Sequence, residues 1–97
     1  MKTELRLSLA EIQKSAVEEI EFLETTSSRH PKWDWPIRLL PYAKEFQKLV
    51  TADTFDLYSA HDFTVRLKDH IKKDRLKGYE PFIWTAEAFE TFVNEKT

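Results

Sequence analysis

Apolar residues in the first quarter of the chain recur at the spacing of one helix face. The stripe consists of Leu9, Ile12, Ala16, Ile20 and Leu23. Positions three and four apart share a face of an α-helix, and the residues between these are mostly polar or charged. Ser8, followed three residues later by Glu11, matches the capping residues that begin helices. We therefore predict a first helix from Leu9 to about Thr25.

Prolines interrupt the pattern in the next part of the chain. The segment 26–36 contains two prolines and several small polar residues, which is typical of a loop. Beyond it, apolar positions from Leu39 to Val50 again share one helix face. A proline in the interior of a helix costs about 3 kcal/mol. We therefore predict that the second helix begins near Pro41 and that residues 36–40 form a separate turn.

Two more helices are predicted from capping residues and apolar periodicity. Ser59 precedes an acidic first turn, and the basic stretch that follows it ends at Gly78. Since glycine often ends a helix, we predict a third helix over residues 60–77. Thr85 precedes a similar first turn and predicts a last helix over residues 86–94.

Three short segments favour β-strands by alternation or by residue type. They are residues 2–7, 54–58 and 82–84. Since the helical signals are longer and independently capped, we predict a mainly α fold with four helices in one compact domain over 1–97. The alternative is an α+β fold in which these segments form a small accessory sheet.

The composition narrows the classes of function. The 97 residues include no cysteine and one glycine, and the formal net charge is −2. Disulfides, thiolate nucleophiles, cysteine-ligated zinc and glycine-rich phosphate loops are therefore excluded. No uncharged apolar run approaches the roughly 20 residues that span a bilayer, and the N-terminus has no apolar signal stretch. We expect a cytoplasmic protein without membrane contact.

The histidines and acids form no recognisable catalytic or metal-binding motif. His61 and His70 are nine residues apart, on roughly opposite faces of a helix, and Asp62 fits the acid that a first helical turn favours. His70 and Asp74 are four residues apart, which predicts a structural hydrogen bond at the rim of the core in preference to a catalytic pair. We expect no enzymatic activity, no metal and no cofactor.

The predicted helix over 60–77 is the most basic part of the chain. Its cations include Arg66, Lys68, Lys72, Lys73 and Arg75. Several cations on one helix can neutralise nucleic-acid phosphates, although Asp69 and Asp74 lie in the same stretch. The alternative function is therefore a DNA-binding transcriptional regulator that uses this helix.

Acidic residues gather in the first predicted helix. They are Glu18, Glu19, Glu21 and Glu24. Two interpretations fit them: an imitation of nucleic-acid charge, or a face that packs against the basic helix over 60–77.

The predicted loop over 26–36 contains two tryptophans, Trp33 and Trp35, with Arg29 and Lys32 nearby. Tryptophan and arginine are enriched in binding hot spots, and the prolines on both sides reduce the entropy lost on association. Alternatively, these rings fold back over the helix ends. We interpret the chain as a small intracellular protein-binding module of the adaptor, inhibitor, antitoxin or immunity type, which occludes or bridges a partner protein. A homodimer through this loop is a further alternative.

Overall fold

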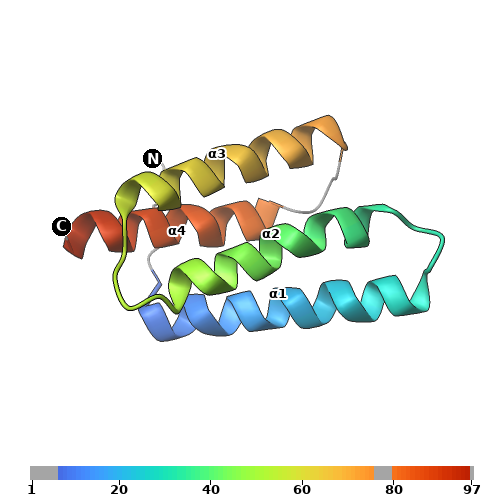
Figure 1. Ribbon diagram of the computed structural model, residues 1–97, viewed down its shortest axis with the longest axis horizontal. Coiled ribbons are helices and arrows are strands. Elements are labelled where there is room, and N and C mark those ends of the chain that lie inside the picture. Colours follow the sequence, from blue (N-terminus) through green and yellow to red (C-terminus); the bar gives the residue numbers. More distant parts are fainter. Residues whose placement is uncertain (1–6, 76–79, 97) are drawn as a thin grey trace.

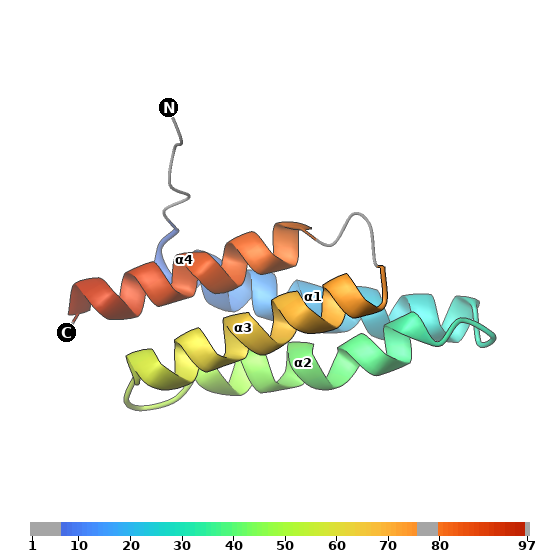
Figure 2. The same ribbon diagram turned by 90° about the horizontal axis from the view of Figure 1, so that it is seen from above.

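The computed structural model describes residues 7–75 and 80–96, and these ranges form four α-helices. The helices are α1 (Leu9–Arg29), α2 (Trp35–Val50), α3 (Leu57–Lys73) and α4 (Glu80–Lys96). Consecutive helices run in opposite directions along the long axis of the molecule (Figure 1). The main packing is between α1 and α2 and between α3 and α4, and the two hairpins close on one another as a bundle (Figure 2). The mainly α, four-helix prediction is confirmed.

The core of the bundle is rich in phenylalanine rings. Phe46 of α2 is 1% exposed, and its ring centroid lies 5.4 Å from Phe63 of α3. Phe82 and Phe89 of α4 each lie 5.8 Å from Phe46, edge to face. Offset and edge-to-face pairs add to the energy of simple burial. One ring of α2 therefore joins α3 and α4 to the α1–α2 hairpin.

The predicted start of α1 is confirmed, and its predicted end is wrong. The Ser8 hydroxyl accepts a hydrogen bond from the Glu11 N–H at 3.2 Å, and the Ser8 N–H donates to the Glu11 carboxylate at 3.3 Å. The helix continues past Thr25 to Arg29. It ends where His30 precedes Pro31, since a residue before proline is driven out of the helical conformation. The loop is therefore 30–34, shorter than predicted.

The predicted start of α2 at Pro41 is also wrong, because this proline lies inside a helix that begins at Trp35. Pro36 occupies the first turn, where a missing N–H removes no bond. Pro41 is on the exposed face, and so is Ile37, whose carbonyl loses its helical donor to the proline. Burial of the opposite face on both sides of Pro41 outweighs the cost of the proline; this face consists of Leu39, Ala43, Phe46 and Val50.

The third helix begins at Leu57, three residues before the predicted start, because Asp56 is the N-cap. The Asp56 carboxylate accepts hydrogen bonds from the N–H groups of Tyr58 at 3.2 Å and Ser59 at 3.3 Å. The Ser59 hydroxyl, predicted to cap the helix, instead donates to Asp56 at 2.8 Å. That bond, together with the two N–H groups, lowers the pKa of Asp56. A carboxylate can accept hydrogen bonds from several donors at once, so Asp56 and not the Ser59 hydroxyl caps the helix.

Replacing Asp56 by alanine is expected to lower the urea midpoint of unfolding more than replacing Ser59 by alanine does. The first change removes the acceptor of two backbone donors, whereas the second removes one side-chain donor. The difference should shrink below the ordinary pKa of an aspartate, because a lowered folded pKa contributes stability only while the carboxylate is ionised. Equal urea midpoints of the two variants at neutral pH would contradict Asp56 as the main cap, because its carboxylate would then stabilise the helix no more than the Ser59 hydroxyl does.

The end of α3 and the start of α4 also differ from prediction. Arg75, just after α3, has a φ of 54°, so it takes the left-handed position that was assigned to Gly78. Gly78 and the predicted last residue, Lys77, lie outside the described residues. Helix α4 begins at Glu80, and the Thr85 hydroxyl donates to the Pro81 carbonyl at 3.0 Å inside it, so Thr85 caps nothing.

No strand occurs in the described ranges, so an accessory sheet receives no support there. Residues 82–84 are helical, and residues 54–58 form a bend followed by the first turn of α3. Of the segment 2–7, only residue 7 is described, and it is not in a strand. Among the described residues, no helix combines the length and the apolar content needed to cross a membrane.

Candidate binding surface

The loop between α1 and α2 presents one tryptophan to solvent and keeps the other against the core. Trp33 is 44% exposed, and its ring stacks on His30 with centroids 3.7 Å apart and planes 8° from parallel. The Trp33 N–H donates to the His30 carbonyl at 2.9 Å, which closes the turn. Trp35, whose ring is 6.0 Å from Trp33, is half-buried and packs against the core. The loop therefore holds Trp33 in a defined orientation while leaving it accessible.

The two predicted cations lie beside the exposed ring. A hollow of about 270 Å³ is lined by Arg29, His30, Pro31, Lys32 and Trp33. Neither Arg29 nor Lys32 forms an ion pair with another part of the chain that the structure describes. We call these five residues the Trp33 surface. It brings together three of the four predicted partner-binding residues and leaves Trp35 to the core.

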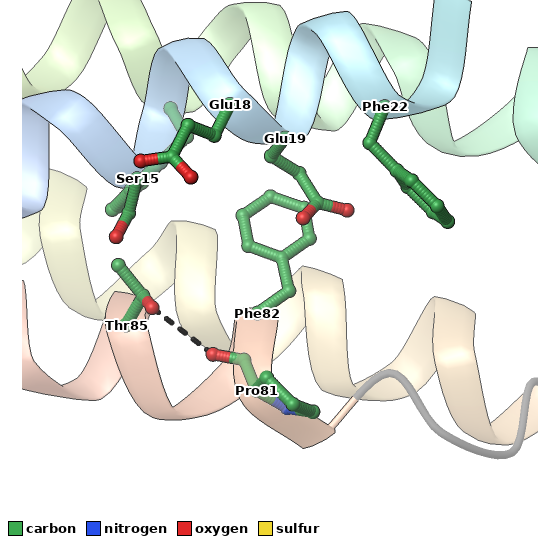
Figure 3. Close-up of a pocket in the computed structure, with 8 residues that line it drawn as sticks. Ser15, Glu18, Glu19, Phe22, Pro81, Phe82 and Thr85 are labelled. Carbon is green, nitrogen blue, oxygen red and sulfur yellow. Dashed lines mark hydrogen bonds between the residues drawn. The ribbon is translucent and has the colours of Figure 1, made fainter. Parts of the chain in front are cut away.

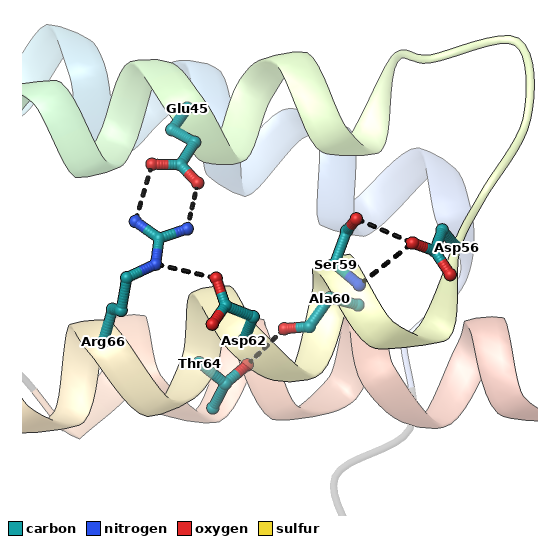
Figure 4. Close-up of polar contacts among 7 residues, drawn as sticks. All are labelled: Glu45, Asp56, Ser59, Ala60, Asp62, Thr64 and Arg66. Carbon is teal, nitrogen blue, oxygen red and sulfur yellow. Dashed lines mark hydrogen bonds and ion pairs between the residues drawn. The ribbon is translucent and has the colours of Figure 1, made fainter.

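Several cations of α3, the most basic helix, form ion pairs with carboxylates of the same molecule. Arg66 holds both carboxylate oxygens of Glu45 on α2, one of them at 3.0 Å, and its Nε donates to Asp62 at 2.9 Å (Figure 4). The hydrogen bonds to Glu45, followed by those to Asp62, raise the pKa of Arg66. Because these carboxylates occupy most of its N–H donors, the Arg66 guanidinium has few donors free to bind a phosphate.

Two of the remaining α3 cations are also paired. Lys68 lies 2.8 Å from the Glu87 carboxylate of α4, and Lys73 lies 3.0 Å from Asp69. Of the residues predicted to contact nucleic acid, Lys72 and Arg75 are thus the ones outside the ion pairs of the described chain. The partners of these α3 cations lie on α2, α3 and α4 and not on α1, so the predicted pairing of the α1 acids with α3 is absent from these contacts.

The predicted hydrogen bond between His70 and Asp74 is wrong: both side chains lie at the rim of the core, but His70 Nε2 and Asp74 Oδ2 are buried without a hydrogen-bond partner in the described chain. Their side chains approach to 3.5 Å, and Asp74 also pairs with Arg38 of α2 at 3.3 Å. The ring of Tyr42 stacks on His70 at 4.8 Å. These contacts connect α3 to α2.

His61 lies beside Glu90 of α4, at 3.1 Å. No group of three metal-ligating side chains occurs within residues 7–75 and 80–96.

A cleft between α1 and α4 was not predicted from the sequence. Its volume is about 310 Å³, and it is lined by Ser15, Glu18, Glu19, Phe22, Phe46, Pro81, Phe82 and Thr85. Helix α1 packs less extensively against α4 than against α2, which leaves room between them. The side chain of Glu19 extends from α1 into the space between the two helices, with the Phe82 ring beside it, and the Glu18 carboxylate lies along α1 near Ser15 (Figure 3).

Glu19 is the most perturbed acid of the described chain. Burial raises its pKa to about 7, and its Oε1 atom is buried without a hydrogen-bond partner. Desolvation disfavours the charged form of a carboxyl group, so such a position costs stability when the group is ionised. Phe22, at the same cleft, is 52% exposed.

One sequence signal could have indicated this cleft. Ser15, Glu19 and Phe22 follow one another at four and three residues, so they form a second helix stripe beside the core stripe of α1. A large apolar residue outside the core stripe is a sign of a second packed or exposed face. The residues that α4 contributes could not be found in this way, because the last helix was predicted to begin at residue 86, beyond all of them.

No protein-family model, no curated protein and no solved structure matches the chain.

Proposed function

We propose that the chain is a small protein-binding module that contacts its partner through the Trp33 surface. The observation that carries the proposal is the exposed Trp33 ring, which is stacked on His30 and closed into a turn. Tryptophan buries a large area on binding, and a ring already held in place loses little entropy. An exposed, ordered tryptophan at the tip of a hairpin therefore suits recognition of a protein.

The charges around Trp33 indicate the chemistry of the partner. Arg29 and Lys32 border the same hollow as the Trp33 ring. Neither forms an ion pair with any residue that the structure describes. A complementary surface would hold an apolar pocket for the ring and carboxylates around it, which would increase the rate and specificity of association. We infer a partner with an acidic rim around an apolar depression.

The alternative of a DNA-binding regulator has less support from the geometry. Arg66, Lys68 and Lys73 are engaged with carboxylates of the same molecule. Each of these pairs would have to open before the cation could contact a phosphate. The positive charge that made α3 a candidate is therefore largely neutralised in place.

Capture from an extract of the native cells, followed by binding measurements with the captured protein, tests the proposal. The tagged chain is used as bait at low and at high salt, with nuclease treatment. We expect one retained protein at both salt concentrations, and Trp33→Ala should weaken its binding about 30-fold or more, the effect of losing a hot-spot residue. Trp84→Ala is the matched control, because Trp84 of α4 is 53% exposed and is not part of the Trp33 surface.

Two outcomes would overturn this proposal. Equal weakening by Trp33→Ala and Trp84→Ala would show that the Trp33 surface has no special role. Retention of nucleic acid that disappears at high salt, and that is reduced by neutralising Lys72 and Arg75, would favour the regulator instead.

A further inference from the structure

The cleft between α1 and α4 combines two kinds of wall. Glu18 and Glu19 supply carboxylates, and Phe22 and Phe82 supply aromatic rings. Rings attract the alkyl stem of a long basic side chain, and their faces also attract the cation at its end. Carboxylates provide the opposite charge for that cation. This combination suits a cationic group on a short hydrocarbon chain.

The negative charge of Glu18 and Glu19 is not balanced by a positive charge among the described residues that line the cleft. None of the eight lining residues is basic, and the buried Oε1 atom of Glu19 has no hydrogen-bond partner. The hydroxyl of Thr85 already donates to the Pro81 carbonyl at 3.0 Å. A buried carboxylate without a partner is costly, and a donor that enters the cleft would remove that cost.

We propose that the α1–α4 cleft binds a lysine or arginine side chain of a partner protein. The volume of about 310 Å³ lies at the small end of ligand pockets, so one side chain fills it better than a cofactor would. The proposal rests on the proposed function only in taking the cation from a protein, and it assigns a contact separate from the Trp33 surface.

The position of the cleft on α1 fits a partner that also reaches the Trp33 surface. Phe22 and Arg29 are seven residues apart on α1, which places them on the same face of the helix and about 10 Å apart along it. Phe22 is 52% exposed and Arg29 is exposed as well. A partner of ordinary interface size therefore spans both sites without bending.

Titration with small cations tests the cleft alone, without any partner. The probes are lysine blocked as its N-acetyl methylamide, butylamine and, as an uncharged control, norleucine blocked in the same way. Amide and aromatic NMR signals report binding, and the signals of Phe22 and Phe82 report its place. At pH 8 we expect the blocked lysine and butylamine to bind with Kd values of about 1–10 mM, as small ligands of few atoms do, and norleucine to bind at least tenfold more weakly.

Variants separate the carboxylate in the cleft from the general acidity of α1. Glu19→Gln keeps the shape and should weaken the binding of blocked lysine about tenfold or more, whereas the exposed Glu21→Gln should leave it unchanged. A saturating concentration of the lysine probe should also lower the pKa of Glu19, since a ligand that prefers the ionised form stabilises it.

Glu18 is the other titratable group that lines the cleft. Helix α2 contributes Phe46, and α4 contributes Pro81, Phe82 and Thr85, none of which titrates.

The outcomes are distinct from those of the Trp33 experiment. Trp33→Ala should leave the binding of blocked lysine unchanged, so either proposal can fail while the other holds. Equal binding of lysine and norleucine, or equal weakening by Glu19→Gln and Glu21→Gln, would overturn the cationic occupant. Binding of butylamine without binding of blocked lysine would overturn a protein side chain in favour of a free amine.

Discussion

Replacing Phe46 by alanine is expected to destabilise the bundle by about 3–5 kcal/mol, the usual cost of removing a buried phenylalanine. The ring is 1% exposed and lies within 5.8 Å of Phe63, Phe82 and Phe89. Its removal leaves a cavity at the point where the two hairpins meet. Because a domain of this size is stable by roughly 5–15 kcal/mol, a large part of the total would be lost.

Urea unfolding followed by far-UV circular dichroism measures this loss. Phe22→Ala is the matched control, because that ring is 52% exposed. Substitutions at such positions usually change stability by about 0.5 kcal/mol or less. If Phe46→Ala cost no more than Phe22→Ala, the assignment of Phe46 to the centre of the core would be wrong.

The number and type of the helices could be predicted because those signals are local. The stripe of α1 and the capping box of Ser8 depend on residues close together in the sequence, and both are present in the structure. The proximity of His70 and Asp74 was local in the same sense, since four positions separate them in the sequence, although the predicted hydrogen bond between them is not formed.

The helix boundaries were less predictable, because several residues competed for each one. Asp56 and Ser59 are both good caps, and the chain uses the carboxylate. Pro41 was taken as a boundary by its intrinsic cost, whereas burial of the opposite helix face offsets that cost. Residues 82–84 have high β-propensity, yet burial of Phe82 in the helical core decides their conformation.

The candidate sites divide in the same way between local and tertiary information. The Trp33 surface lies within five consecutive residues, so its members could be named from the sequence. The neutralisation of Arg66 by Glu45 could not, because the two residues are 21 positions apart on different helices. The cleft needed both α1 and α4 to be placed before Glu19 and Phe82 could be brought together.

Glu19 is expected to make the stability of the protein fall as the pH rises from about 5 to 8. Burial raises the folded pKa of Glu19 from 4.5 to about 7, so between these values the folded chain holds a proton that the unfolded chain has released. The free energy of unfolding therefore decreases with rising pH across this window, and it is independent of Glu19 below and above it. The full shift corresponds to about 3 kcal/mol, and since water partly reaches the side chain we expect about 2 kcal/mol.

Glu19→Gln should remove this fall, so that the variant exceeds the natural chain in stability by about 2 kcal/mol more at pH 8 than at pH 4.5. Urea unfolding at several pH values measures the difference, and Glu21→Gln should reproduce the pH profile of the natural chain. Subtracting the profiles cancels the contributions of all groups that the three proteins share. A parallel offset of the Glu19→Gln profile would mean that Glu19 titrates normally. A loss of the slope would mean that the bundle keeps a destabilising carboxylate in its α1–α4 cleft.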